Sequence, residues 1–436
     1  MIARYLLPAL SLFAVTANAQ DGAWPGFRGP GRDGIAPSAK PLVKWSDDEG
    51  VRWKTELPGP GSSSPIVVGD CVYVACYSGF GYHLENGGEM KDLKHHLVCV
   101  ERSSGKIVWD CIVPGPLEKR PPRVQIVEHG FASPTPVCDG KAIYAYFGRA
   151  GVVAISLEGK VLWKEDLGLP SPDAPAATNS VERGGRRISL RWGAAASPLL
   201  HDGLVIVNSS EENNAIQAFD KKTGKVVWKR ESANLEGTAI SPMLAGPASA
   251  PYVLMALGGE IWALQPKTGK LLWSVETDTR GGMSSTSVAD EEMIYVFGGE
   301  GKNYTLRIGA KDGASRVAWR SKNVEIPSPV LYDGKLFLVN MQGMGVCMNA
   351  KDGEVLFDGR LEGRTSQVYA SPVLADGRLY VVTRKRGVFV YSADGKFSLQ
   401  ARNELTDGTQ FNASPAIVGD QIYLRSDKQL FCLAGK

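Results

Sequence analysis

The sequence predicts an all-β fold in which four-stranded antiparallel blades form a closed ring of eight, an eight-bladed β-propeller. Three observations favour this class: a turn motif that recurs along the chain, a repeat of 43 or 44 residues, and an N-terminal strand that completes the last repeat. The 436 residues include 50 Gly and 26 Pro, and a helical period is hard to find in them. A β-solenoid is the alternative architecture, but solenoid coils usually have shorter periods.

The turn motif is clearest in residues 218–228, which read A-F-D-K-K-T-G-K-V-V-W. The short acceptor side chain of Asp220 opens a turn, and Gly224 supplies the positive φ that a tight corner needs. The flanking apolar residues then pair as a hairpin that ends in Trp228. An aromatic residue at this place in each repeat is expected to fill the gap between neighbouring blades. These predicted structural docking residues are Trp53, Trp109, Trp163, Trp228, Trp273, Trp319, Phe357 and Phe397.

Each repeat begins with Ser-Pro or a variant of it, and the starts recur every 43 or 44 residues from Ser197 onward. Proline is tolerated at the beginning of a strand and on edge strands, and the innermost strand of a propeller blade is an edge. The predicted starts are Ser64-Pro65, Ser133-Pro134, Ser197-Pro198, Ser241-Pro242, Ser285-Thr286, Ser328-Pro329, Ser371-Pro372 and Ser414-Pro415.

The two ends of the repeat region complement each other. The last repeat, from Ser414, stops at Lys436 just past its third strand, and residues 51–57 read as a Trp strand without a repeat of its own. Joining them completes the eighth blade and leaves no exposed sheet edge between the first and last blades. The predicted organisation is a signal peptide over 1–19, an N-terminal extension over 20–50 and one propeller domain over 51–436.

The N-terminal residues 1–20 are typical of a secretory signal. They contain Arg4, an apolar run from Leu6 to Val15, and a small-x-small cleavage site that ends at Ala19. The apolar run is too short to span a bilayer, so we expect a soluble, monomeric protein that is periplasmic or secreted. The formal net charge is +3, and no basic stripe with interleaved aromatics is present, which argues against nucleic acid as a partner.

Seven cysteines are an odd number for an oxidising compartment. Cys99 and Cys347 each lie six residues before a turn glycine, where other repeats carry Ala, which indicates small buried residues. Disulfides between Cys76 and Cys99, or between Cys99 and Cys111, are the alternatives within the first repeat.

Three insertions, at 77–96, 114–132 and 169–196, interrupt the repeat in or after the first two blades. Function on propellers collects in long loops. Four of the five His lie between 83 and 129, but they lack the spacing of a metal-binding motif, so no metal site is predicted. The Arg-rich third insertion is either a site for an anion or acidic partner or an ordinary solvated loop.

Small residues lead into the inner strands near Ser133 and Ser197 and would leave room at the mouth of the ring channel. His129 and Arg149 could then reach a ligand bound there. Close packing of the inner strands around the axis is the alternative.

The motif of residues 218–228, and its copy in 263–273, resembles the tryptophan-docking motif of the pyrroloquinoline quinone (PQQ)-like propeller family. The resemblance covers about residues 51–436, and residues 24–34 are similar to the leader segment of many exported members. The family includes quinoprotein dehydrogenases, which bind PQQ and usually Ca²⁺. It also includes a non-enzymatic lipoprotein scaffold of the outer-membrane barrel assembly machine. The dehydrogenases resemble one another in a vicinal Cys-Cys pair, and this sequence has neither that pair nor a C-x-x-C-H haem motif.

The stretch 188–191 resembles a stretch of the assembly scaffold that contacts its partner, which implies that Leu190 and Arg191 bind a partner. The sequence departs from that scaffold in lacking a lipid-anchor Cys at the cleavage site, since its first Cys is Cys71. The acidic residue expected near the start of the next blade has Glu236 as its nearest candidate.

Three aromatic residues, Tyr82, Trp192 and Trp262, lie outside the docking positions. Their exposure on one face would indicate a sugar- or polymer-binding propeller, a third and weaker possibility.

The function predicted from these observations is a non-catalytic protein- or ligand-binding scaffold in the cell envelope. Its partner would be an envelope protein or a small ligand, and no cofactor is predicted. The alternative is a PQQ-dependent dehydrogenase of alcohols or sugars with a divergent site that uses PQQ and Ca²⁺. Fold and site are separate questions, and no catalytic residue could be assigned from the sequence.

Overall fold

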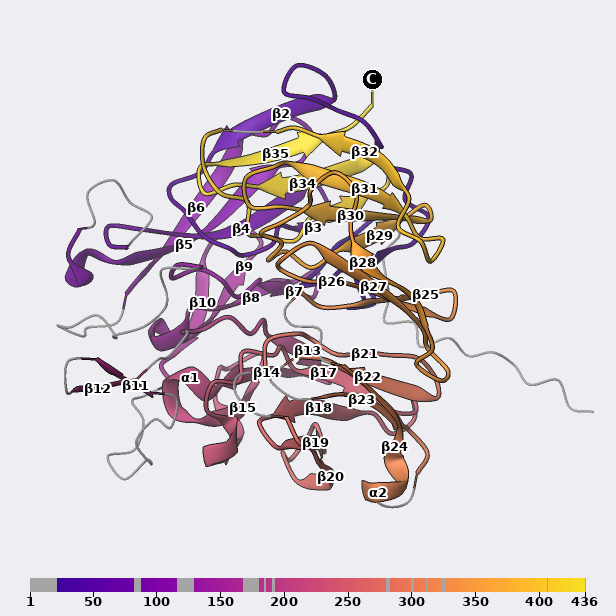
Figure 1. Ribbon diagram of the computed structural model, residues 1–436. Helices are drawn as coiled ribbons and strands as arrows, with labels where there is room; N and C mark the ends of the chain where they lie inside the picture. Colours follow the sequence, from indigo (N-terminus) through magenta and orange to yellow (C-terminus); the bar gives the residue numbers. More distant parts are fainter. Residues whose placement is uncertain are drawn as a thin grey trace, which may run out of the picture.

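The computed structural model describes residues 22–435, with the exception of 82–87, 116–128, 168–179, 184–185, 190–192, 280–282, 299–301, 311–312, 323–326 and 406. Eight sheets follow one another around a ring, and the first strand of each sheet is the innermost (Figure 1). The predicted eight-bladed propeller is therefore confirmed.

Seven blades are each built from four consecutive antiparallel strands, with the first strand nearest the axis. Blade 1 contains β3 Ile66–Val68, β4 Cys71–Ser78, β5 Lys94–Glu101 and β6 Ile107–Pro114, and blade 2 contains β7 Val137–Cys138, β8 Ala142–Tyr146, β9 Val152–Ser156 and β10 Val161–Glu165. Blade 3 contains β13 Leu199–His201, β14 Leu204–Ser209, β15 Ala215–Asp220 and β16 Val226–Glu231, and blade 4 contains β17 Met243–Ala245, β18 Tyr252–Leu257, β19 Glu260–Leu264 and β20 Leu271–Glu276. Blade 5 contains β21 Val288–Ala289, β22 Met293–Val296, β23 Lys302–Arg307 and β24 Val317–Lys322, and blade 6 contains β25 Val330–Tyr332, β26 Lys335–Val339, β27 Met344–Asn349 and β28 Val355–Arg360. Blade 7 contains β29 Val373–Ala375, β30 Arg378–Val382, β31 Val388–Ser392 and β32 Leu399–Asn403.

Blade 8 combines the two ends of the chain. Its strands β33 Ala416–Val418, β34 Gln421–Arg425 and β35 Gln429–Leu433 are followed in the sheet by β2 Val51–Glu56. Val51 lies opposite Leu433 and Trp53 lies opposite Cys432. Figure 1 shows this closure as the indigo β2 beside the yellow β35. The predicted donation of an N-terminal strand is confirmed, because the fourth place in this sheet is taken by residues from the N-terminal part of the chain.

Few other elements are present in the described part of the chain. β1 Ile35–Ala36 pairs in parallel with β29, and β11 Ser180–Arg183 forms a hairpin with β12 Arg186–Ser189. No helix among the described residues is long and apolar enough to cross a membrane. The helices are α1 Ser210–Asn213, α2 Gly313–Arg316, and the 3₁₀ turns η1 Met90–Asp92, η3 Gly148–Ala150 and η4 Ala233–Leu235.

The tryptophan of one blade lies against the turn glycine of the next. A Cβ added at Gly224 would lie 2.6 Å from the Trp163 ring, and one at Gly269 would lie 2.5 Å from the Trp228 ring. Both glycines also have positive φ, 73° and 66°. Two reasons therefore require glycine at this position of the turn: its backbone has a positive φ, and the ring of the neighbouring blade comes too close for a Cβ. The same contact joins Trp53 to Gly105, Trp109 to Gly159, and Trp319 to Gly353.

Each of these indole rings is also held by a hydrogen bond to the following blade. The Nε1–H of Trp163 donates to the carbonyl oxygen of Lys221 at 3.0 Å, and that of Trp228 donates to Pro266 at 2.8 Å. Buried tryptophan needs such an acceptor for its single polar group. The ring is thus oriented as well as buried. The remaining donors and acceptors are Trp53 to Arg102, Trp109 to Leu157, and Trp319 to Ala350.

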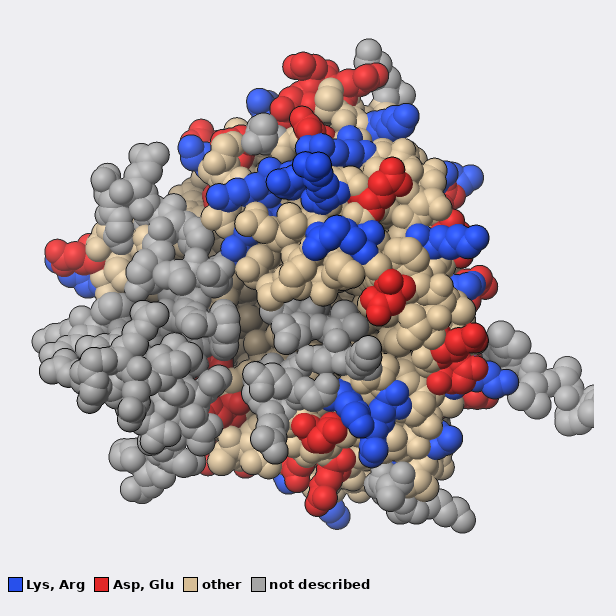
Figure 2. Space-filling view, in the orientation of Figure 1, with Lys and Arg blue, Asp and Glu red and all other residues tan. Residues whose placement is uncertain are grey.

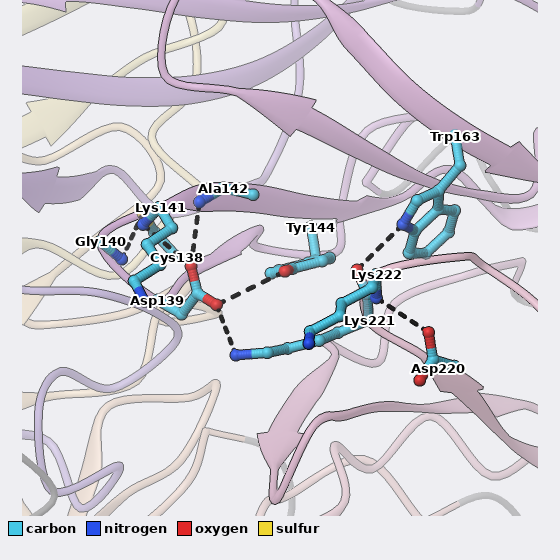
Figure 3. A network of polar contacts seen from close by, with 10 residues as sticks. All are labelled: Cys138, Asp139, Gly140, Lys141, Ala142, Tyr144, Trp163, Asp220, Lys221 and Lys222. Atoms are coloured by element: carbon cyan, nitrogen blue, oxygen red, sulfur yellow. Dashed lines mark hydrogen bonds and ion pairs between the residues drawn. The ribbon is translucent and has the colours of Figure 1, made fainter.

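A polar cluster accompanies the ring contact between blades 2 and 3 (Figure 3). Asp139 accepts from the Nζ of Lys221 at 2.8 Å and from the main-chain N–H groups of Lys141 and Ala142, and the Tyr144 hydroxyl lies 3.4 Å away. Burial opposes ionisation of Asp139, but these bonds and the charge of Lys221 lower the pKa of the carboxyl below its ordinary value. Asp139 therefore links the two blades as a carboxylate.

The junction between blades 4 and 5 departs from this pattern because α2 is inserted at the turn. The guanidinium carbon of Arg316 lies 4.2 Å from the centre of the Trp273 ring, and an Arg316 nitrogen donates to the carbonyl oxygen of Ile308 at 3.0 Å. A planar cation over an indole face is favourable. Arg316 thus covers the ring that a turn glycine meets elsewhere.

The position assigned to Phe397 needs correction. Val390 pairs with Ala401, at the register where Ala218 pairs with Trp228 in blade 3. Phe397 instead lies in the preceding turn with a φ of 54°, because this hairpin is one residue longer than those of blades 1, 3, 4 and 6. Its ring is buried, and the centre of the ring lies 5.4 Å from that of Phe357. Phe397 therefore packs against the aromatic residue of blade 6, at the position where a turn glycine makes this contact in other blades.

Trp45 supplies the ring that blade 7 lacks. It is stacked on Tyr380 with 6.4 Å between ring centres and 10° between ring planes, whereas other blades place their own tryptophan against the equivalent tyrosine, as Trp163 lies against Tyr144. The side-chain amide of Asn403 accepts from the main-chain N–H of Trp45 at 2.9 Å and donates to the carbonyl oxygen of Val43 at 2.9 Å. The small Ala401 leaves the room for this ring.

The N-terminal segment from Trp24 to Ala36 crosses the end of the ring where the inner strands finish. Trp24 bridges to Val67 of blade 1, and Arg32 donates to the carbonyl oxygen of Leu200 in blade 3 at 3.1 Å. Arg28 is 2% exposed and donates to the carbonyl oxygen of Pro329 in blade 6. β1 then joins blade 7. One segment thus ties together blades on opposite sides of the ring and closes this end of the axis.

We predict that Trp228→Ala will lower the free energy of unfolding by about 3–5 kcal/mol, because it removes a buried ring and leaves a cavity at a blade junction. Chemical denaturation measures this change. The matched control is Val227→Ala at the neighbouring residue, which is 48% exposed and should change the free energy by less than about 0.5 kcal/mol. Equal effects of the two substitutions would contradict the docking role of the ring.

We predict that the coupling energy between Asp139 and Lys221 depends on pH. The pKa of Asp139 is lowered in the folded protein, so its stabilisation is present above the ordinary value of 3.8 and is lost as the pH falls through the folded pKa. A double-mutant cycle with Asp139→Asn and Lys221→Met should give about 0.5–1.5 kcal/mol near neutral pH. The coupling should shrink as the pH falls below 3.8 and through the lowered pKa of the folded carboxyl. A coupling energy that is the same at both pH values would refute the charged pair.

Candidate functional site

A belt of hydrogen bonds surrounds the axis at the blade starts. The main-chain N–H of one start donates to the side-chain hydroxyl of the next, as from Ser328 to Ser371 at 3.0 Å and from Ser371 to Ser414 at 2.9 Å. The hydroxyl at six of the starts thus acts as an acceptor between blades. The other bonds of this kind run from Ser64 to Thr135, Thr135 to Ser197, Ser197 to Ser241, and Thr286 to Ser328.

The belt corrects two predicted starts. In blade 2 the hydroxyl that takes part belongs to Thr135, so the start is Thr135-Pro136 and not Ser133-Pro134. In blade 5 it is Thr286 that donates to Ser328, one residue after the predicted Ser285. Both errors arose because more than one residue matches the motif: blade 2 has two successive Ser/Thr-Pro pairs, and blade 5 has four consecutive hydroxyl residues.

A cavity of about 190 Å³ lies on the axis inside this belt. Its lining comes mostly from the residues at and just before the blade starts, and Phe27 of the N-terminal segment contributes to it. The lining residues are Phe27, Ser62, Ser64, His129, Ser133, Thr135, Ala195, Ser197, Ser284, Pro327, Ser328, Tyr369, Ser371, Arg384, Asn412 and Ser414. The space-filling view is hollowed near its middle, with Lys and Arg gathered above the hollow (Figure 2).

Arg384 is the one guanidinium among these lining residues. Its guanidinium carbon lies 3.9 Å from the centre of the Tyr369 ring, and its Nε–H donates to Asn412 Oδ1 at 2.7 Å. Stacking on one side and a hydrogen bond on the other fix the plane of the guanidinium group. The hairpin between β30 and β31 that carries Arg384 also presents Lys385 and Arg386, which are exposed.

The residues predicted for the channel mouth are only partly brought together. His129 lines the cavity, and its carbonyl oxygen accepts from the Ser62 hydroxyl at 2.9 Å. Arg149 lies in η3, is half-buried, and does not line this cavity. Leu190, Arg191 and Trp192 lie outside the described residues.

Two of the residues singled out in the sequence have structural surroundings. Trp262 is 5% exposed, donates to Glu260 at 2.6 Å and lies under the guanidinium of Arg230, so it is not an exposed sugar platform. Glu236 directly follows η4 and is half-buried. Tyr82 lies outside the described residues.

Two histidines of the first insertion, His95 and His96, are packed into blade 1, and His83 lies outside the described residues. Burial lowers the pKa of His95 to about 3, and its ring is stacked 4.8 Å from that of Phe147. His96 Nε2 lies 2.8 Å from the Ser78 hydroxyl and its Nδ1 lies 2.9 Å from Asp110, an order of groups seen in serine hydrolases. The His96 side chain is only 5% exposed, which fits a polar network inside the blade. No metal-binding group of His, Cys, Asp or Glu is found among the residues that the structure describes.

All seven cysteines are described, and each is a free thiol. The two disulfides considered for the first repeat, Cys76–Cys99 and Cys99–Cys111, are therefore not formed in this structure. Cys99 is fully buried, and burial raises the pKa of the Cys76 thiol to about 11. These thiols are packing residues, as the sequence indicated for Cys99 and Cys347.

A buried acidic pair beside blades 2 and 3 was not predicted from the sequence. Glu211 and Glu212 are 7% and 3% exposed in α1, and the Tyr146 hydroxyl donates to Glu212. Burial and this carboxylate raise the pKa of Tyr146 well above its ordinary value. An E-E-N-N run between two apolar strands was the available signal, but it reads as a surface turn.

The axial residues do not fit PQQ and Ca²⁺. PQQ is a fused three-ring quinone with three carboxylates, and pockets for ligands of such size usually have about 300–1,000 Å³, against about 190 Å³ in this cavity. No Asp or Glu is among the lining residues, whereas protein sites for Ca²⁺ are built largely from carboxylate oxygens. Phe27 and Arg28 occupy the end of the axis where a larger cavity would have to extend.

Curated relatives of the chain include a scaffold and an enzyme. The outer membrane protein assembly factor BamB of Escherichia coli K12 is 23% identical over 209 residues, which cover 46% of this chain and 50% of that protein. The match thus spans about half the length of the BamB proteins of Escherichia coli and Shigella dysenteriae. A polyvinylalcohol dehydrogenase from Pseudomonas sp. is 24% identical over 452 residues, 76% of this chain and 68% of that protein.

Solved structures of both kinds share the fold. BamB from Moraxella catarrhalis superposes with a TM-score of 0.59 at 14% identity, covering 88% of this chain and 99% of that one. A europium-containing methanol dehydrogenase superposes with a TM-score of 0.66 at 11% identity, covering 95% and 98%. At these identities the likeness shows the propeller fold alone.

The family model described as outer membrane protein assembly factor BamB matches residues 93–314 and 305–435. These matches overlap, so together they run without a break from β5 of blade 1 to β35 of blade 8. They cover well over half of the chain, so the chain belongs to this BamB family of PQQ-like repeat propellers.

Proposed function

We propose that this protein is an exported, non-catalytic binding scaffold of the cell envelope. Its single propeller domain over 51–436 would present the long loops of blades 1 to 3 to an envelope protein. The observation that carries this proposal is the axial cavity, which is small, lacks carboxylates and is closed at one end by Phe27 and Arg28. A propeller with this axis has little room for a quinone cofactor, and membership of the BamB family supports an assembly role.

Export is supported by the signal expected over residues 1–19. The related proteins are named as assembly factors for outer membrane proteins, which supports an envelope location for this chain. We therefore place the protein in the periplasm or outside the cell after cleavage near Ala19.

The proposed partner surface includes Leu190 and Arg191, which the short resemblance to the assembly scaffold implicates. The flanking hairpin of β11 and β12 carries further cations, Arg183, Arg186 and Arg187. An acidic or partly acidic partner surface would suit this composition.

A dehydrogenase is the second candidate, because a polyvinylalcohol dehydrogenase is among the curated relatives. Under this alternative PQQ and Ca²⁺ would bind on the axis. The dimensions and the lining of the cavity argue against it.

We expect the purified protein to show no saturable binding of PQQ, with or without Ca²⁺, and no reduction of a dye by alcohols or sugars. Absorbance and fluorescence titrations measure the binding. One-to-one binding with substrate-dependent dye reduction would overturn the scaffold proposal and establish a quinoprotein.

We predict that cross-linking in whole cells captures an envelope protein and that Leu190→Ala with Arg191→Ala lowers the yield about tenfold or more, since hot-spot residues each contribute over about 1 kcal/mol. The matched control is Leu356→Ala with Arg360→Ala, an exposed Leu and Arg on β28 of blade 6. Undiminished capture by the first variant would remove the assigned surface.

A further inference from the structure

Three polar side chains on blade 1 form a chain of hydrogen bonds. The hydroxyl oxygen of Ser78 lies 2.8 Å from Nε2 of His96, and Nδ1 of His96 lies 2.9 Å from a carboxyl oxygen of Asp110. The residues come from the neighbouring strands β4, β5 and β6, and the pairing of these strands places them on one face of the blade. The register of the sheet therefore holds the imidazole between the hydroxyl and the carboxylate.

The direction of these bonds suits the removal of a proton from the hydroxyl. A carboxylate only accepts hydrogen bonds, so Nδ1 of a neutral His96 carries the ring proton and Nε2 presents its lone pair to Ser78. The hydroxyl of Ser78 then donates to Nε2, which is the bond through which an imidazole takes up the proton of a serine nucleophile. Asp110 thus selects the tautomer of His96 that such a reaction needs.

The hydroxyl end of this network is accessible from solvent. Ser78 is half-buried, and Gly79 after it and Lys94 opposite it are exposed, whereas the His96 side chain is only 5% exposed. Ile112 pairs with His96 on the same face and is 50% exposed. An electrophile can therefore approach Ser78 from outside and place an apolar group against Ile112, while the base stays covered.

We propose that Ser78 is a nucleophilic modification site that takes up a short apolar acyl group from an ester. Its Oγ attacks the carbonyl carbon, the bond from Oγ to that carbon forms, and the bond from the carbon to the alcohol oxygen breaks. His96 receives the hydroxyl proton on Nε2 and passes it to the departing alkoxide, so an alcohol is released and nothing is oxidised or reduced. Asp110 is a positioning residue that orients the ring.

The expected reaction is a single acylation of each chain. No donor to the oxygen of the attacked carbonyl is assigned among the described residues, and in enzymes one such donor contributes about 10²–10³ in rate. Ser78 should therefore react with activated electrophiles, without turnover of unactivated substrates. This proposal goes beyond the scaffold role and does not depend on it, because it concerns the strands of blade 1 and neither residues 190–191 nor the axial cavity.

The test is labelling of the purified exported protein with a fluorophosphonate, a reagent for activated serine hydroxyls. The bond from Oγ to phosphorus forms in this reaction, and fluoride leaves with the hydroxyl proton. Mass spectrometry of the peptides should find one group per chain, at Ser78. Release of p-nitrophenol from p-nitrophenyl acetate, in an amount equal to that of the protein and absent in Ser78→Ala, then shows that the site also accepts an acyl group.

His96→Gln should slow the labelling about 100-fold or more, because the proton acceptor is lost. Asp110→Asn should slow it about tenfold or more, since the amide can donate to Nδ1 and favour the wrong tautomer. Asp110→Glu keeps the carboxylate and should restore part of the rate, which a merely structural role of Asp110 would not require. Thermal denaturation of each variant verifies that the ring is intact.

Ser392→Ala is the matched control. Ser392 is the last residue of β31 as Ser78 is of β4, it is also half-buried, and its hydroxyl donates to the carbonyl oxygen of Ser398 instead of to an imidazole. Ser392 should stay unlabelled in the intact protein, and its replacement should change the labelling rate at Ser78 by less than about twofold, as for a surface change away from the site.

Absence of the label from Ser78 in the intact protein would overturn the proposal. Equal labelling rates in the intact protein and in the His96 and Asp110 variants would also overturn it, because the hydroxyl would then react without its base. If His96→Gln does not fold, the two Asp110 variants decide, since that side chain is 29% exposed. Neither result bears on the capture of an envelope protein through residues 190–191, so the reactive serine and the scaffold role fail independently.

Discussion

The fold depends on one contact, a flat aromatic ring lying on a turn that has no Cβ. At Gly224 a side chain would collide with the Trp163 ring, and the same turn needs the positive φ that glycine adopts without strain. Because the ring touches the tyrosine of its own blade and the turn of the next, its burial couples neighbouring sheets. The contact therefore determines how far apart the blades stand and, by repetition, how many of them close the ring.

The exceptions show that the shape of the junction matters more than the residue that fills it. Arg316 covers Trp273 where an inserted helix displaces the turn, and Phe397 receives Phe357 where the hairpin is longer. Trp45 enters from the N-terminal segment to stack on Tyr380 beside the small Ala401. Each solution places a planar group in the same gap, because an empty gap of that size would cost several kcal/mol.

The sequence was sufficient to predict the ring, its blade number and its closure, because these follow from a local turn motif repeated at a fixed spacing. The sequence did not predict correctly those positions that depend on which residues pair between neighbouring strands. Phe397 was placed in the strand by proximity to a turn glycine, although the extra residue in the hairpin moves Ala401 into that place. Thr135 was missed for a similar reason, since Ser133 is an equally good match to the start motif.

The site was harder to predict than the fold. His129 was found because it precedes an inner strand, but Arg384 and Asn412 belong to loops of ordinary length on blade 7 and before blade 8. Their proximity results from the curvature of the ring, which brings residues from distant blades to one axis. The longest loops belong to blades 1 to 3, and a search for function in long loops therefore misses Arg384, which lies across the channel from these blades.

The closure of blade 8 by β2 has a consequence for how the ring forms. Val51 and Leu433 are separated by almost the whole chain, so this pairing closes the largest loop in the molecule and has the highest entropic cost of any strand pairing in it. The other blades can form from adjacent segments in the order in which they are made. The strand that is synthesised first in the ring must remain unpaired until the last one is complete, with its edge open to a chaperone or a neighbouring chain in the interval.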